Sequence, residues 1–176
     1  EIRPRDWSSD VCSSDLRSGA LDRLMAALDH GRPTGITWDG VLLDKIRWPS
    51  PFADPGRDLA CFCGACARAA GADGIDLDEV RRGIAAAVST APGRVELAAT
   101  LLGATASGPI AAWLRWRAAA ITRLVDEAID HIARRGARVA LDVFAPVLAT
   151  GVGQDLGALS RSAELVKAMV YLGTHG

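Results

Sequence analysis

Apolar residues spaced three or four positions apart recur along most of the chain, as in helices that bury one face. Glycine and proline residues bound these stretches, as they do at helix ends. Asp76, with Glu79 three residues later, resembles a capping box at one helix start. We therefore predict helices over 17–30, 61–70, 76–88, 109–135 and 155–164, while 95–102 is ambiguous and fits a helix.

Three other segments are short apolar runs of strand length. We predict strands over 37–46, 138–144 and 165–172, and a proline-rich loop over 48–59. The resulting order of strand, helices, strand, helix, strand favours a parallel sheet with crossover helices. Because side chains alternate across a strand, each predicted strand has one purely apolar face suited to packing under helices.

The opposite faces of these strands carry polar residues, namely Asp44, Asp142, and the pair Lys167 and Tyr171. If these faces point to a common barrel axis, two carboxylates, an ammonium and a phenol converge there. Paired carboxylates of different acidity cleave glycosidic bonds, one protonating the leaving oxygen while the other attacks or activates water. We interpret Asp44 and Asp142 as catalytic and Lys167 and Tyr171 as substrate-binding residues. The alternative is an Asp–Lys ion pair that fills the core of the barrel.

Four further side chains have both a functional and a structural interpretation. Arg47 could hold a substrate carboxylate or pair with Asp44. Trp48, at a strand exit, could stack on a sugar or cap the loop. Gln154, in a glycine-rich loop, could hydrogen-bond a ligand or stabilise the turn. Arg117 interrupts an apolar stripe, and we interpret it as snorkelling to solvent, with a site contact as the alternative.

Cys61, Cys63 and Cys66 form a C-x-C-x-x-C motif. Thiolates at this spacing can bind one Zn²⁺, which usually takes four ligands in a structural site. The motif supplies three, so a fourth would come from elsewhere, His30 or a residue upstream being conceivable. A zinc ion here would brace the loop. The alternatives are three free buried thiols or a redox C-x-x-C pair.

Charge and hydropathy narrow the possible partners. The formal net charge of the whole chain is −1. Residues 1–16 contain four acidic residues and two arginines. No basic excess exists to neutralise phosphates, which argues against nucleic acid as a partner. Charge or glycine interrupts every apolar stretch, so we expect no membrane span. The sequence indicates neither the cellular location nor the oligomeric state.

Residues 1–16 resemble a translated sequencing-library adapter, the match being carried by DWSSDVCSSDL at 6–16. The alternative is a natural arm rich in serine and aspartate. We interpret 1–16 as non-native and disordered and exclude them, with Cys12, from the fold. Residues 17–176 are then expected to be one domain fragment, truncated at both ends.

Residues 39–50 (DGVLLDKIRWPS) resemble a strand motif of uncharacterised glycoside hydrolases with a TIM-barrel fold. The later stretches VALDVF, VGQ and VKAMVY are similar to that family's following strands and glycine–glutamine loop, although Ala168 stands where the family usually has proline. Separately, CFCGAC at 61–66 resembles the zinc loop of family 42 β-galactosidases. That family's Asn–Glu acid pair has no match here, since Leu43 and Asp44 stand in its place, so β-galactosidase activity does not carry over.

The resemblance implies a partial (β/α)8 barrel of about three consecutive parallel βα units. It implies a glycoside hydrolase acting on a carbohydrate, with Asp44 after the fourth strand as general acid. The nucleophile would then lie beyond Gly176, and the fragment itself would be inactive. The competing expectation is a non-catalytic carbohydrate-binding or structural barrel with a zinc-braced loop.

Overall fold

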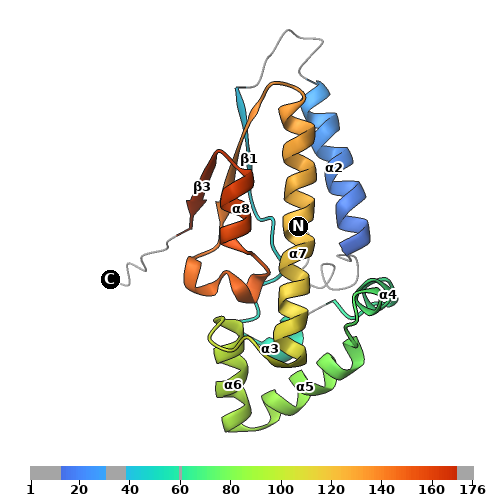
Figure 1. Cartoon of the computed structure of the whole chain (residues 1–176), viewed down its shortest axis with the longest axis vertical. Helices are drawn as coiled ribbons and strands as arrows, with labels where there is room; N and C mark the ends of the chain where they lie inside the picture. Colours follow the sequence, from blue (N-terminus) through green and yellow to red (C-terminus); the bar gives the residue numbers. More distant parts are fainter. Residues whose placement is uncertain (1–12, 31–38, 60, 170–176) are drawn as a thin grey trace, which may run out of the picture.

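The computed structural model of the chain describes residues 13–30, 39–59 and 61–169 (Figure 1). Within these ranges three strands form one parallel sheet in the order β1-β2-β3. They are β1 (Gly40–Leu43), β2 (Arg138–Val143) and β3 (Leu165–Ala168). The mixed α/β class and the parallel strands predicted from the sequence pattern are thereby confirmed. Closure into a barrel stays a prediction.

Seven α-helices accompany the sheet in the described part of the chain. The side chain of Asp76 accepts hydrogen bonds from two backbone N–H groups of the first turn of α5, which starts that helix. Gly136 has φ +78°, a left-handed conformation that stops the longest helix, α7, within a few residues of its end. The helices are α2 (Ser13–His30), α3 (Pro55–Asp58), α4 (Gly64–Ala72), α5 (Leu77–Ser89), α6 (Ala91–Leu101), α7 (Gly108–Ala133) and α8 (Leu156–Ser162).

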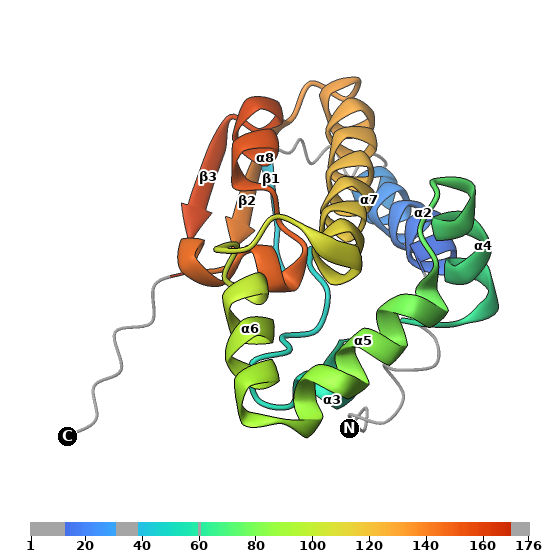
Figure 2. The same ribbon diagram turned by 60° about the horizontal axis from the view of Figure 1, so that its bottom comes forward.

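One face of the sheet is buried beneath helices. Val139, Leu141 and Val143 alternate along β2 and are at most 5% exposed, because α7 contacts β2 and α8 contacts β3. Helix α2 lies beside α7, and α3 to α6 gather near the N-terminal end of α7 (Figures 1 and 2). The carboxyl ends of the strands point towards this same end of the molecule (Figure 1).

The other face of the sheet is open to solvent. Leu42 in β1 and Leu165 in β3 are 55% and 60% exposed, although both are large apolar residues. Asp142 in β2 and Lys167 in β3 therefore lie on the side of the sheet opposite α7, as the alternation along the strands requires.

Several element boundaries differ from the predicted ones. Strand β1 ends at Leu43, because Lys45 adopts φ +57°, which is incompatible with an extended chain. Helix α3 occupies part of the predicted loop, because Asp54 caps it and Pro55 fits its first turn. The ambiguous stretch 95–102 is helical up to Leu101 as part of α6, which Thr90 caps at its start.

Helix α2 begins at Ser13, four residues before its predicted start and inside the segment predicted to be disordered. Once the helix has formed further along, each added residue contributes one backbone hydrogen bond without a new nucleation step. Residues 1–12 lie outside the described residues. None of the helices in the described ranges has the length and hydropathy needed to cross a bilayer.

Candidate metal centre and the polar edge of the sheet

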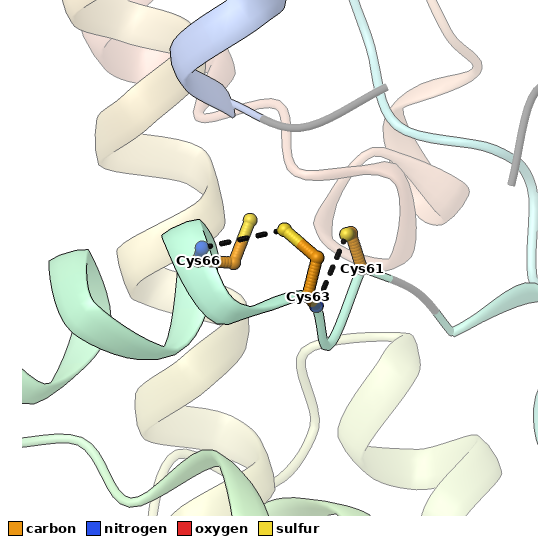
Figure 3. Close-up of side chains that lie close together, drawn as sticks. All are labelled: Cys61, Cys63 and Cys66. Carbon is orange, nitrogen blue, oxygen red and sulfur yellow. Dashed lines mark hydrogen bonds between the residues drawn. The ribbon is translucent and has the colours of Figure 1, made fainter. Parts of the chain in front are cut away.

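Three cysteine thiols converge between the end of the proline-rich loop and the start of α4. The Sγ atoms of Cys61, Cys63 and Cys66 all lie within 4.8 Å of one another (Figure 3). None of the three forms a disulfide. Thiolates around a tetrahedral zinc ion at a Zn–S distance of about 2.3 Å are about 3.8 Å apart, so small side-chain movements would bring these three sulfur atoms to the spacing of a tetrahedral shell.

The local backbone explains why the thiols face one another. Cys63 is the N-cap of α4, and its Sγ accepts a hydrogen bond from the backbone N–H of Cys66 at 3.5 Å. The Sγ of Cys61 accepts from the backbone N–H of Cys63 at 3.4 Å (Figure 3). Both donors stabilise negative charge on sulfur, as does the N-terminus of the helix. The motif therefore folds into a turn that is already suited to holding thiolates.

Burial sets this cluster apart from surface cysteines. Cys66 is fully buried, Cys61 is 8% exposed and Cys63 is half-buried. Burial raises the pKa of the Cys61 thiol above its ordinary value, and the neighbouring Cys63 side chain acts in the same direction, whereas the Cys63 N–H opposes it. In the absence of metal, the Cys61 thiol is accordingly held as the neutral form at neutral pH.

Arg117, on α7, is linked to the cysteine loop through aromatic rings. Its guanidinium stands 4.8 Å from the ring centre of Trp48 and 4.7 Å from that of Trp113. The ring of Trp113 also stacks on Phe62, between the first two cysteines, at 5.1 Å. The aromatic contacts thus connect the cysteine loop, α7 and the loop after β1.

The interpretation of Arg117 as a snorkelling residue is wrong. Its side chain is fully buried, because the indoles of Trp48 and Trp113 enclose it. Burial lowers its pKa to about 9, against an opposing effect of the Cys66 charge, so the guanidinium stays protonated at neutral pH. Its Nε, Nη1 and Nη2 atoms have no hydrogen-bond partner among the described residues.

The donor set suits a soft or borderline metal ion. Three thiolates favour Zn²⁺ or Cu⁺ over the oxygen-seeking Mg²⁺ and Ca²⁺. No fourth Cys, His, Asp or Glu joins the cluster within the ranges that the structure describes. The cluster therefore offers three sulfur atoms that could hold a metal ion, and the predicted zinc ligands Cys61, Cys63 and Cys66 do come together.

A second group of predicted residues lies at the carboxyl edge of the sheet. Asp142 in β2 pairs in register with Lys167 in β3, and Lys167 Nζ donates to Asp142 Oδ2 at 3.2 Å. The side chain of Asp142 is 11% exposed and that of Lys167 is 64% exposed. Asp44 is exposed and follows Leu43, which pairs with the residue before Asp142. The parallel register therefore brings Asp44 level with the Asp142–Lys167 ion pair.

The remaining predicted substrate-binding residues connect the loops around this edge. The Gln154 side chain accepts from Phe144 N at 2.7 Å and donates to the Ile46 carbonyl at 3.0 Å. The Arg47 guanidinium lies 4.8 Å from the ring centre of Phe144 and donates to the Trp48 carbonyl at 3.2 Å.

The surroundings of these residues bear on their predicted roles. Trp48 is 3% exposed, and its indole N–H donates to the Arg117 carbonyl at 3.4 Å. The oxygen and the nitrogen of the Gln154 side-chain amide both bond backbone atoms, and the Trp48 ring packs against Arg117. Binding of a ligand by Arg47, Trp48 or Gln154 stays a prediction, while Tyr171 lies outside the described residues.

A cleft of about 390 Å³ lies between the turn after α6, the first half of α7 and the loop after β2. Its polar lining comes from Thr100, Thr105, Arg115, Thr150, Gln154 and Asp155. Neither Asp44 nor Asp142 lines it, so Gln154 is the predicted site residue that the cleft and the loops around the polar edge share.

Comparison with known proteins adds no further constraint. No family model, curated protein or solved structure matches this chain. The resemblance to glycoside hydrolases therefore stays a prediction that rests on the sequence motifs.

Sequence reasoning missed the relation between Arg117 and the cysteine cluster. The available signal was an arginine four residues after Trp113 in the apolar stripe of a long helix. That pattern identifies a cation on the buried face of the helix. It does not identify the distant cysteine loop, whose Phe62 stacks on Trp113 of the same helix.

Proposed function

We propose that Cys61, Cys63 and Cys66 bind one divalent metal ion, zinc by preference, which braces the loop between β1 and α4. The observation that carries the proposal is the convergence of three sulfur atoms within 4.8 Å on a preformed helix N-terminus. Zinc has no redox chemistry of its own and accepts tetrahedral thiolate shells, as a structural role requires. The fourth ligand comes from a residue outside the cluster or from solvent.

Cobalt titration of the full chain tests this proposal. Co²⁺ substitutes for zinc, and thiolate ligation gives an intense near-ultraviolet charge-transfer absorption whose strength follows the number of sulfur ligands. We expect saturation at one equivalent, displacement by Zn²⁺, and a rise in the unfolding temperature of the zinc-loaded protein. Absence of the charge-transfer band in the reduced wild-type chain would contradict the proposal.

Matched serine variants locate the site. Cys66→Ser should weaken Co²⁺ binding strongly, because it removes a fully buried ligand. Cys12→Ser removes the thiol outside the cluster and should leave the spectrum unchanged, unless Cys12 itself provides the fourth sulfur. A spectrum insensitive to Cys66→Ser would place the metal elsewhere.

We propose hydrolysis of glycosidic bonds as a second candidate function. It is supported by the parallel register, in which Leu43, just before Asp44, pairs with Leu141, just before Asp142. Asp44 would protonate the leaving oxygen, while the Lys167 ammonium stabilises negative charge on Asp142. The bound metal would then brace the loop that follows the acid.

Hydrolysis of a panel of aryl glycosides and polysaccharides, by this chain and by a longer protein that contains it, tests this second function. Asp44→Asn should lower kcat by about 10²- to 10⁴-fold, the usual contribution of a general acid. Asp39→Asn changes an exposed aspartate just before β1 and serves as the control. Sugar binding without turnover would instead support the non-catalytic carbohydrate-binding alternative, and unchanged activity in Asp44→Asn would remove the proposed role of that residue.

A further inference from the structure

Arg117 is a buried cation with no hydrogen-bond acceptor. It is fully buried, and none of its three nitrogen atoms has a partner among the described residues. The two indoles that flank it provide cation–π attraction, at 4.8 Å and 4.7 Å, but no full negative charge. A guanidinium in this position is costly unless a counter-charge is present under working conditions.

The cysteine cluster is connected to this cation by geometry. The guanidinium lies 4.7 Å from the ring centre of Trp113, and that ring stacks at 5.1 Å on Phe62, between Cys61 and Cys63. Cys66 is fully buried, and a negative charge on its sulfur favours the protonated form of Arg117. Cysteines bind metals as thiolates and release their protons when the ion enters. A divalent ion on three thiolates carries a net charge of −1. One buried guanidinium beside it makes the assembly neutral.

We propose that Arg117 is the charge-balancing positioning residue of the metal centre formed by Cys61, Cys63 and Cys66, a role that rests on the metal binding proposed above. The buried cation stabilises the anionic metal–thiolate form and not the metal-free form. Trp48 and Trp113 hold the guanidinium in place, and Phe62 connects this assembly to the cysteine loop by stacking on Trp113.

A purely packing role for Arg117 predicts a different behaviour. An apolar side chain of similar length would fill the same space without the penalty of a buried charge, so packing does not explain why the residue is charged. If Arg117 served the core alone, shortening or neutralising it would alter the stability of the metal-free protein and leave metal affinity unchanged. Charge balance predicts that neutralising Arg117 weakens metal binding and stabilises the metal-free protein.

The experiment compares Arg117→Met, which removes the charge, with Arg117→Lys, which keeps it. The dissociation constant of Co²⁺ and the urea midpoint of the metal-free protein are measured on the full chain. We expect Arg117→Met to weaken Co²⁺ binding by about 10- to 100-fold, as for other residues that support metal ligands. The same variant should raise the urea midpoint of the metal-free protein, whereas Arg117→Lys should retain most of the affinity.

Arg123→Met is the matched control, because Arg123 lies on the same helix but is exposed. It should leave the Co²⁺ affinity unchanged. Equal Co²⁺ affinity in wild type and Arg117→Met, or equal weakening in the methionine and lysine variants, would overturn the role of Arg117 while leaving metal binding intact. A wild-type chain that binds no Co²⁺ would instead overturn the metal centre itself, and this inference with it.

If Arg117→Met does not fold, Arg117→Gln takes its place as the neutral variant. Should both neutral variants fail to fold in metal-free buffer while Arg117→Lys folds, the charge would be needed without metal. That result would also overturn the proposal.

Discussion

Lys167 and Asp142 stand opposite each other on neighbouring parallel strands, with Lys167 Nζ 3.2 Å from Asp142 Oδ2. The two ends of this ion pair have unequal surroundings, because the lysine side chain is 64% exposed and the aspartate side chain is 11% exposed. Asp142 Oδ1 is buried and has no hydrogen-bond partner among the described residues. Water can solvate the lysine without its partner, whereas the carboxylate has little access to water and relies on the lysine to balance its charge.

This asymmetry predicts that removing the lysine harms stability more than neutralising the aspartate. Lys167→Met leaves a largely buried carboxylate unpaired and should lower the free energy of unfolding by about 1–2 kcal/mol, between the values for exposed and buried pairs. Asp142→Asn leaves a lysine that water can solvate and should cost less than about 1 kcal/mol. Urea unfolding of both variants measures the difference.

Arg81→Met provides the reference for an exposed pair, since Arg81 and Asp78 are 65% and 69% exposed. It should change the free energy of unfolding by less than about 0.5 kcal/mol. A larger loss in Asp142→Asn than in Lys167→Met would show that the carboxylate does not depend on this partner.

The Gln154 side chain connects the loop after β1 to the loop after β2. It accepts a hydrogen bond from Phe144 N and donates one to Ile46 O. Gln154→Leu keeps the volume but leaves two part-buried backbone groups without this partner. The expected loss is about 2–4 kcal/mol, from about 1–2 kcal/mol for each group, the lower part of the range for an unsatisfied buried group. Denaturant unfolding at neutral pH checks the value.

Ser160→Ala is the control for Gln154, because Ser160 is exposed and its hydroxyl bonds only a neighbouring carbonyl of the same helix turn. It should be close to neutral. Gln154→Glu keeps the acceptor for Phe144 N and loses the donor to Ile46 O, so it should also be destabilising. A Gln154→Leu protein as stable as wild type would mean that water replaces both bonds.

Buried Cys61 makes the stability of the metal-free chain depend on pH. Its pKa is raised from the ordinary value of 9.0 by burial, so above that value the unfolded chain loses a proton that the folded chain keeps. The stabilisation is complete below pH 9.0 and decreases as pH rises through the folded-state pKa, by at most about 1.4 kcal/mol per pH unit.

The measurement is urea unfolding of wild type and Cys61→Ala from pH 7.5 to 10 with reductant and chelator present. The stability advantage of wild type over the variant should shrink above about pH 9. An advantage that stays constant or grows over this range would contradict the sign of the shift.

Local sequence determined most of the secondary structure of this chain. Helical periodicity identified α5 and α7, and the apolar runs identified the three strands of the described residues. These signals are local, because the buried positions of each element follow one another at a fixed spacing along the sequence. Strand β1 was predicted too long because the left-handed φ of Lys45 has no signal in its residue type. Helix α3 was missed because four residues are too few for a periodic pattern.

The candidate sites were predictable to different degrees. The cysteine cluster was predictable because its three ligands lie within six residues of one another in one turn. The partner of Gln154 is 108 residues away, at Ile46, and Arg117 meets the loops of Trp48 and Cys66 only through tertiary packing. Contacts of this range depend on how elements pack, and no local pattern specifies them.

Gly153 lies directly against the Trp48 ring, and its replacement tests how tightly that ring is packed. The residue has φ +72°, and a Cβ atom built on it would lie 2.5 Å from Trp48 Cδ1. Gly74 has a similar φ of +78° but no atom within 4 Å of such a Cβ. Gly74→Ala therefore measures the backbone strain alone, about 1 kcal/mol, and Gly153→Ala measures that strain together with a steric clash in the core.

We expect Gly153→Ala to lower the free energy of unfolding by about 2–4 kcal/mol, because overpacking adds about 1–3 kcal/mol to the strain. Trp48 would have to move, and with it one of the two rings that enclose Arg117. Gly153→Ala should therefore also weaken Co²⁺ binding, whereas Gly74→Ala should not. Equal stability losses in the two variants would mean that Trp48 yields freely and that the packing around Arg117 does not constrain the metal centre.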